Sequence, residues 1–143
     1  LAVALLVAVL AARGLRIARR ARVDYSPFFA PTIRAGHPLL VVLIGAGARV
    51  VAHDPVAMDA ARRELPAAWF SGGQLRFAPD QYETLRDVDA MALVTEWKPF
   101  RHPDFERMRA LMKNAVIFDG RNQYDPRAMK ESGFEYYGIG RGA

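Results

Sequence analysis

The sequence predicts an α/β domain built on a doubly wound parallel sheet, for three reasons. Short apolar runs alternate with helix-like segments along residues 38–143. Several of these runs, above all Val116–Asp119, place β-favouring residues at consecutive positions, which is typical of parallel strands buried on both faces. The chain has 143 residues with an ordinary apolar fraction of 52%, which fits a single domain.

The first 37 residues form a segment of unusual composition, rich in alanine and arginine. An apolar run over residues 1–12 comes before the arginines. A helix needs about 20 residues to cross a bilayer, and signal peptides carry their charges ahead of the apolar core, so we expect no membrane span and no signal peptide. The run predicts either a buried first strand over residues 6–10 or a short core helix. Residues 24–38, with three prolines and a glycine, predict a loop.

The net charge of +5 belongs entirely to this end of the chain. Residues 1–38 hold six arginines against one aspartate, whereas residues 39–143 hold equal numbers of basic and acidic side chains. The first 37 residues also lack glutamate, lysine and asparagine, so we expect them to be irregular or artefactual, as if read from a shifted frame. Because the chain begins at Leu1 without a methionine, we expect a piece of a longer protein.

Residues 38–143 predict helices and strands in strict alternation. The segments expected in the first half are a helix from 38 to 45, a strand over 48–54, a helix over 56–65, a turn-rich connection over 69–73 and a strand over 74–78. Those in the second half are a helix from 80 to about 88, strands over 89–95 and 116–119, helices over 103–113 and 125–132, and a last strand over 134–139. This alternation predicts a Rossmann-like single domain.

Gly45 and Gly47 admit two interpretations. They resemble the glycine turn of a dinucleotide-binding site, but that turn must open a helix, and the residues after Gly47 predict a strand. A pair of glycines that ends the preceding helix fits better. Asp54 lies at the end of the same strand and is expected to cap a helix or form a turn, although a dinucleotide-binding domain would bind a ribose at such a position.

Arg121 is the candidate binding residue that the pattern itself selects. Gly120 and Arg121 follow the strand Val116–Asp119, at the edge where an open α/β sheet places its ligands. The planar guanidinium suits phosphate or carboxylate. The residues alone leave a second interpretation open, in which Arg121 pairs with Asp119 or a helix carboxylate and binds nothing.

Other chemistries find little support in the sequence. There is no cysteine, which excludes disulfides, thiolate metal sites and a thiol nucleophile within this chain. The three histidines are scattered, the serines lie in no nucleophile elbow, and we assign neither a metal ligand nor a catalytic residue.

Three ordered motifs resemble a known family. They are GARVVAHDP at residues 47–55, VTEW at 94–97 and IFDGRN at 117–122, followed by Gly133-Phe134 and YGIGR at 137–141. Together, over about residues 38–143, they closely resemble the carboxyl-terminal, UDP-binding domain of the UDP-glucose/GDP-mannose dehydrogenase family.

The resemblance implies an enzyme that oxidises UDP-glucose to UDP-glucuronate in two NAD-dependent steps through a thioester. It implies a UDP-sugar substrate, NAD bound mainly by domains outside this chain, a cysteine-bearing central domain that forms a homodimer, and a cytoplasmic location. Arg121 matches the family arginine that reaches the sugar nucleotide across the domain interface.

The family also carries a Phe-Lys pair that grips the uridine diphosphate and an acidic loop whose arginine approaches NAD. The nearest stretch here, residues 28–34, keeps a phenylalanine, Thr32 and Arg34 but lacks the lysine, both aspartates and the Glu-Ser. By this resemblance Arg34 is the candidate cofactor contact. The alternative is a non-catalytic Rossmann-like interaction module whose basic tail binds acidic lipid or nucleic acid, with a steep salt dependence.

Overall fold

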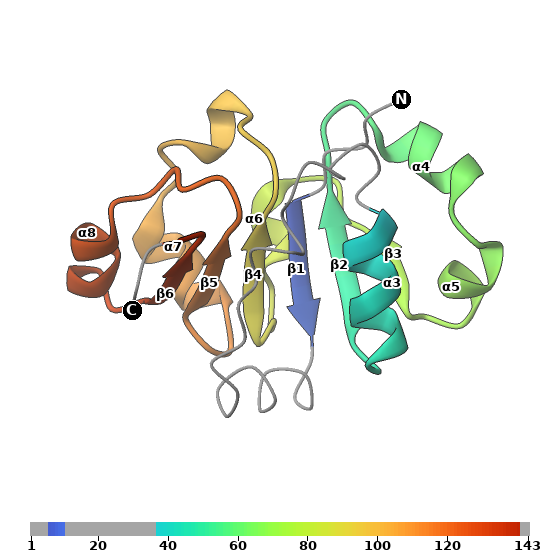
Figure 1. The fold of residues 1–143 in the computed structure, drawn as a ribbon, viewed down its shortest axis with the longest axis horizontal. Helices are drawn as coiled ribbons and strands as arrows, with labels where there is room; N and C mark the ends of the chain where they lie inside the picture. Colours follow the sequence, from blue (N-terminus) through green and yellow to red (C-terminus); the bar gives the residue numbers. More distant parts are fainter. Residues whose placement is uncertain (1–5, 11–36, 141–143) are drawn as a thin grey trace.

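The central sheet of the domain has six strands in the order β3-β2-β1-β4-β5-β6 (Figure 1). The computed structural model describes residues 6–10 and 37–140. Within these ranges the strands are β1 Leu6–Leu10, β2 Arg49–His53, β3 Leu75–Phe77, β4 Ala90–Leu93, β5 Val116–Asp119 and β6 Glu135–Gly138.

The sheet consists of two parallel ladders joined by β1. Strands β2 and β3 pair in parallel, as do β4, β5 and β6, whereas β1 runs antiparallel to both β2 and β4. The predicted parallel α/β sheet is therefore confirmed in both ladders, with β1 as the exception. Of the two interpretations of residues 6–10, the strand is confirmed.

The described helices are α3 His37–Gly45, α4 Met58–Glu64, α5 Ala67–Ser71, α6 Gln81–Thr84, α7 Phe105–Leu111 and α8 Pro126–Glu131, with a 3₁₀ turn, η2, at Lys98–Phe100. Most of the predicted helices are present with narrower bounds. The predicted turn-rich connection over 69–73 was wrong for residues 69–71, which belong to α5, whereas Gly72 and Gly73 form a turn. Pro66 precedes that helix and its carbonyl accepts a hydrogen bond from the Trp69 backbone, which starts a helical turn there.

Helices cover both faces of the sheet, as alternate residues along β4 and directly after it show. Ala92 and Val94 pack into a core cluster with residues of α3 and α4, whereas Met91 and Leu93 pack into a second cluster with residues of α7 and α8. Figure 1 shows α3 in front of the sheet and α7 behind it. The doubly wound arrangement predicted from the sequence is confirmed.

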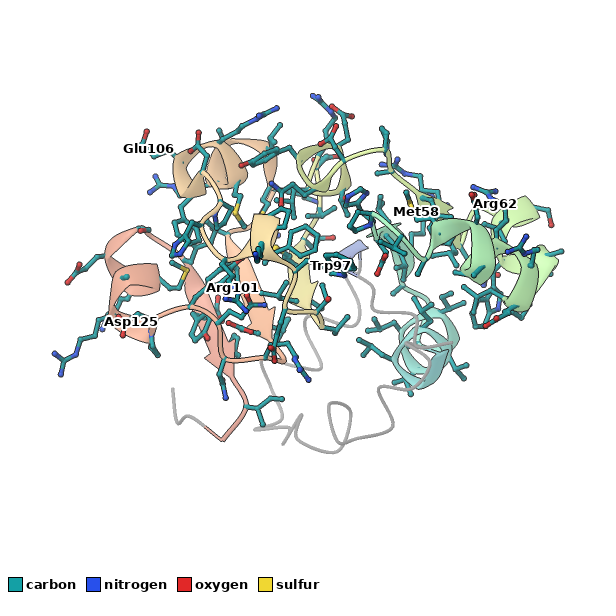
Figure 2. The ribbon with its side chains drawn as sticks, turned by 90° about the horizontal axis from the view of Figure 1, so that it is seen from above. Met58, Arg62, Trp97, Arg101, Glu106 and Asp125 are labelled. Atoms are coloured by element: carbon teal, nitrogen blue, oxygen red, sulfur yellow. The ribbon has the colours of Figure 1, made fainter. Side chains whose placement is uncertain are left out.

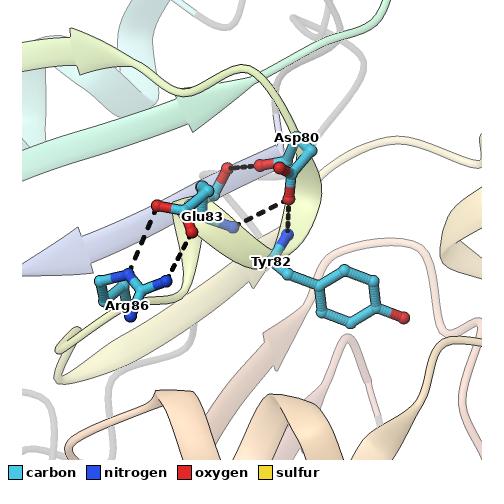
Figure 3. Close-up of polar contacts among 5 residues, drawn as sticks. Asp80, Tyr82, Glu83 and Arg86 are labelled. Carbon is cyan, nitrogen blue, oxygen red and sulfur yellow. Dashed lines mark hydrogen bonds and ion pairs between the residues drawn. The ribbon is translucent and has the colours of Figure 1, made fainter.

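Aspartates begin the helices on the side of the second cluster. The Asp80 carboxylate accepts hydrogen bonds from the backbone N–H groups of Tyr82 and Glu83, as drawn in Figure 3. Asp104 and Asp125 accept equivalent bonds at α7 and α8. These caps satisfy N–H groups that have no partner inside a helix.

The turn between α3 and β2 shows what the glycine pair does. Gly45 is the last residue of α3, and Gly47 follows it with φ of +86°, a value that favours glycine. β2 begins two residues later. The interpretation of the pair as a helix stop is confirmed.

Arg34, the candidate cofactor contact, lies outside the described residues, as does most of the basic segment over residues 1–37. Among the residues that the structure describes, no helix is long and apolar enough to span a membrane.

Candidate anion-binding site at the carboxyl edge of the sheet

The carboxyl ends of β4, β5 and β6 meet at one edge of the sheet. Leu93 pairs in register with Asp119, and Asp119 pairs with Gly138. The loops that follow these three strands therefore start side by side at the carboxyl edge of the sheet. Open α/β sheets bind their ligands at this edge. Arg121 and Glu96 both come from this edge.

Asp119 holds the loop after β5 in shape. Its side chain is fully buried, and Oδ1 accepts a hydrogen bond of 2.9 Å from the backbone N–H of Arg121. Oδ2 accepts bonds of 3.0 Å from the backbone of Tyr124 and 2.9 Å from the hydroxyl of Tyr136. Three donors offset the burial of this carboxylate. Because one of them is the Arg121 backbone, Asp119 fixes where the Arg121 side chain starts.

The Arg121 guanidinium points toward the neighbouring loop after β4. Its Nη2 lies 2.5 Å from Oε1 of Glu96. The two side chains keep 33% and 50% of their surface exposed, so the pair is open to solvent. Of the partners that the sequence suggested for Arg121, Asp119 takes its backbone N–H, and the carboxylate on its guanidinium belongs to Glu96 instead.

Further hydrogen bonds tie the three loops at this edge together. Gln123 donates from Nε2 to the carbonyl of Thr95 at 2.5 Å, and the backbone N–H of Gly120 donates to the carbonyl of Leu93 at 2.8 Å. Asn122, with φ of +53°, donates from Nδ2 to the carbonyl of Ile139 at 3.0 Å. Arg121 therefore stands on a loop that is anchored on both of its neighbours.

Tyr124 adds a buried tether between the same loops. Its hydroxyl donates to the carbonyl of Phe100, at the end of η2, over 2.6 Å. Burial, followed by the nearby Asp119 charge, raises the pKa of Tyr124 well above its ordinary value. The phenol therefore stays protonated and remains a donor across the physiological range.

Two buried oxygens in the same loop lack hydrogen-bond partners within the described part of the chain. They are Oδ1 of Asn122 and Oε1 of Gln123, the residues directly after Arg121. Each amide already donates through its nitrogen to a neighbouring strand end. The loop therefore keeps accepting capacity beside its guanidinium.

The rim of this edge is both charged and aromatic. Glu96, Trp97, Lys98 and Arg101 are exposed on the loop after β4. Figure 2 labels Trp97 and Arg101 near the middle of the molecule, whereas Glu106 on α7 lies far to one side. With Arg121, the rim carries more basic than acidic groups, which favours an anionic ligand.

Asp54 and His53, at the carboxyl end of β2, both make local contacts. Asp54 accepts bonds of 2.8 and 2.7 Å from the backbone of Val56 and Ala57, which confirms its role in a turn. His53 is buried and its Nδ1 lies 3.0 Å from the carbonyl of Ala78. No group of three or more potential metal ligands occurs among residues 6–10 and 37–140.

Sequence reasoning selected Arg121 but missed the contribution of Glu96 and the anchoring amide of Gln123. The signal for Glu96 was its place just beyond the end of a predicted strand, the same signal that selected Arg121. The pairing of the two depends on β4 and β5 being neighbours, which the order of residues does not reveal.

Comparisons with known proteins identify the family to which this domain is similar. Residues 37–126 match the family model described as "UDP-glucose/GDP-mannose dehydrogenase family, UDP binding domain". The chain is 45% identical over 103 residues to the UDP-glucose 6-dehydrogenase of Pseudomonas aeruginosa, an alignment that covers 72% of this chain and 22% of the relative.

Two further relatives show similar coverage. The UDP-glucose 6-dehydrogenase of Rhizobium meliloti is 38% identical over 96 residues, 67% of this chain and 20% of the relative. UDP-glucose 6-dehydrogenase TuaD of Bacillus subtilis is 34% identical over 97 residues, 68% of this chain and 20% of the relative. The chain thus spans about a fifth of the length of these relatives. From the family match and these identities, we conclude that the chain belongs to the UDP-glucose/GDP-mannose dehydrogenase family and carries its UDP binding domain.

Proposed function

We propose that this chain is the carboxyl-terminal portion of a UDP-glucose 6-dehydrogenase and that it supplies UDP-sugar binding to the NAD-dependent oxidation of UDP-glucose to UDP-glucuronate. The three relatives described above are named for this enzyme. In this proposal Arg121 is the residue of this chain that contacts the diphosphate.

The observation that supports this role is the placement of the Arg121 guanidinium. It is partly exposed at the carboxyl edge of the sheet, on a loop anchored through Asp119 and Gln123. An arginine whose backbone is already ordered loses little further freedom when it binds, and its parallel donors match two oxygens of a phosphate. The exposed Lys98 and Arg101 follow the neighbouring strand β4 and add positive charge to that loop.

The described residues do not fit the pyrophosphate of NAD in the usual dinucleotide turn. Gly45 and Gly47 end α3 and lead into β2, so no helix begins there to direct its N–H groups at a phosphate. We therefore assign NAD mainly to the amino-terminal domain that such enzymes place ahead of this one. Arg34 remains the proposed contact of this chain with the cofactor.

The thiol needed for thioester chemistry must also come from outside this sequence, which contains no cysteine. The proposal accordingly makes this chain inactive by itself. Activity would require the NAD-binding and central domains, with the central domain forming a homodimer, in the cytoplasm. The contribution of the present residues is to bind and orient the nucleotide sugar.

Isothermal titration calorimetry tests the assignment. UDP, UDP-glucose and uridine are titrated into the chain alone and into the chain fused behind the amino-terminal domains of the Pseudomonas relative. We expect UDP and UDP-glucose to bind more tightly than uridine, because uridine lacks the diphosphate. Absence of heat for UDP and UDP-glucose in both proteins would refute the proposal.

Two variants sharpen this test. Arg121→Ala should weaken UDP binding by about tenfold or more, as expected for a lost charge-assisted hydrogen bond, and should leave uridine binding unchanged. Arg127→Ala removes an exposed arginine from the adjacent helix α8 and serves as the matched control. Equal effects of the two substitutions would show that only net charge matters.

A further inference from the structure

Glu96 occupies the position on the Arg121 guanidinium that an anionic ligand would need. Its Oε1 lies 2.5 Å from Nη2, and both side chains reach solvent. We propose that Glu96 is an internal competitor of the diphosphate: its carboxylate holds Arg121 in the unliganded chain and must give way when the ligand binds. This inference rests on the proposed function of Arg121.

The geometry holds the backbones of Glu96 and Arg121 close to each other. Glu96 follows β4 and Arg121 follows β5, two strands paired in register at Leu93 and Asp119. The Gln123 amide bonded to the Thr95 carbonyl fastens one loop to the other. Because the two backbones are held in place, displacement of Glu96 is a matter of side-chain rotation.

The ion pair is weak enough to be displaced. With half of the Glu96 side chain and a third of the Arg121 side chain exposed, solvent screens the attraction. A diphosphate carries more negative charge than one carboxylate and offers several oxygens to the guanidinium. Glu96 nevertheless stays nearby and repels the ligand, so it lowers affinity without abolishing binding.

The alternative role for the same contact is positioning. In that case Glu96 would hold the guanidinium in the orientation that receives the phosphate, and its removal would weaken binding. The two roles predict changes of opposite sign, which makes them separable by one substitution.

The experiment compares UDP binding to the 143-residue chain and its Glu96→Gln variant by calorimetry at low salt. Glutamine keeps the size and hydrogen-bonding capacity of the side chain but removes its charge. We expect the variant to bind UDP more tightly by a factor of about two to five, the range set by an exposed ion pair. The factor should approach one at about 0.5 M salt, because salt screens exposed charges.

Three further proteins test the mechanism. Glu106→Gln removes an exposed carboxylate from α7, which Figure 2 shows well apart from Trp97, the neighbour of Glu96, and should change UDP affinity much less. Arg121→Ala combined with Glu96→Gln should bind no more tightly than Arg121→Ala alone, because the competitor acts through the guanidinium. Thermal unfolding of each variant checks that the fold is intact.

The outcomes separate this inference from the function on which it rests. If the wild-type chain binds UDP and Glu96→Gln binds it equally or more weakly, the competitor role is overturned while the proposed function stands. Binding by the variant where the wild-type chain gives no heat supports the competitor role. If neither protein binds UDP, the result refutes both the competitor role of Glu96 and the proposed nucleotide binding by this chain.

Discussion

The carboxylate of Asp119 at the end of β5 accepts a 2.9 Å hydrogen bond from the hydroxyl of Tyr136 on β6. The same oxygen also accepts from the backbone of Tyr124. One fully buried side chain thus joins a neighbouring strand to the loop that carries Arg121. The shape of the candidate site depends on this carboxylate, although it does not face the ligand.

We predict that Asp119→Asn destabilises the domain by about 1–3 kcal/mol. The amide nitrogen would face donors that now bond to a carboxylate, which leaves buried N–H or O–H groups without an acceptor. The measurement is chemical denaturation at neutral pH. Asp59→Asn, an exposed change on α4, is the control and should alter stability by less than about 0.5 kcal/mol. Equal effects of the two substitutions would contradict the buried role of Asp119.

Tyr124→Phe should lower stability at pH 7 by about 0.5–1.5 kcal/mol, because the bond to the Phe100 carbonyl is lost. Burial raises the pKa of Tyr124 above the ordinary 10.0, so the unfolded chain loses this proton first as the pH rises. The stability that the phenol contributes is complete below pH 10 and declines as the pH rises toward its folded pKa. Urea unfolding at increasing pH should therefore show the gap between variant and wild type narrowing above pH 10. A gap that stays constant would contradict this.

Asp80→Ala should cost about 1 kcal/mol at neutral pH, because α6 loses its cap. The backbone N–H of Glu83 is the main cause that lowers the Asp80 pKa below its ordinary 3.8. The contribution of the carboxylate is therefore present above that ordinary value and is lost as the pH falls through the folded one.

Asp80→Asn separates the cap from its charge. Asparagine still accepts a backbone hydrogen bond but does not titrate. Thermal unfolding between pH 7 and 2.5 should give a smaller acid-dependent loss for Asp80→Asn than for the wild-type chain. Identical acid profiles would show that this carboxylate contributes nothing to acid sensitivity.

Gly133→Ala should destabilise the domain by about 1 kcal/mol or more, because Gly133 ends α8 with φ of +81°. A methyl group there would also lie 2.6 Å from Nη1 of Arg109, which would have to leave its contact with the Ser132 carbonyl. Gly45→Ala is the matched control, since nothing lies within 4 Å of the added atom. It should be neutral or slightly stabilising in thermal unfolding. Equal losses would argue against a backbone effect.

The sequence predicted best where a single local signal decided the structure. The strand Val116–Asp119 was predicted with the bounds that the structure shows, because a short apolar run meets an aspartate and a glycine. The helix starts predicted at residues 80 and 125 agree with α6 and α8, which each begin one residue later. The helix after Asp80 was predicted too long: α6 ends at Thr84, and Asp87 has φ of +58°, which a right-handed helix does not allow.

What the sequence did not reveal depends on which strands become neighbours. The residues of Leu6–Leu10 are all apolar, and hydrophobic periodicity does not indicate the direction in which a strand runs. The antiparallel pairing with β2 and β4 was therefore not predictable. The contact between Glu96 and Arg121 likewise depends on the register of β4 against β5. Arg121 could be selected from the sequence because it follows a predicted strand. Its ion pair with Glu96 could be identified only from the order of the strands in the sheet.

A structure determined with UDP bound is the measurement that tests the central claim most directly. Our account predicts the guanidinium of Arg121 within hydrogen-bond distance of a phosphate oxygen, with its 2.5 Å contact to Glu96 broken and the Asp119 contacts retained. A nucleotide bound elsewhere, or bound here while Arg121 remains on Glu96, would contradict it.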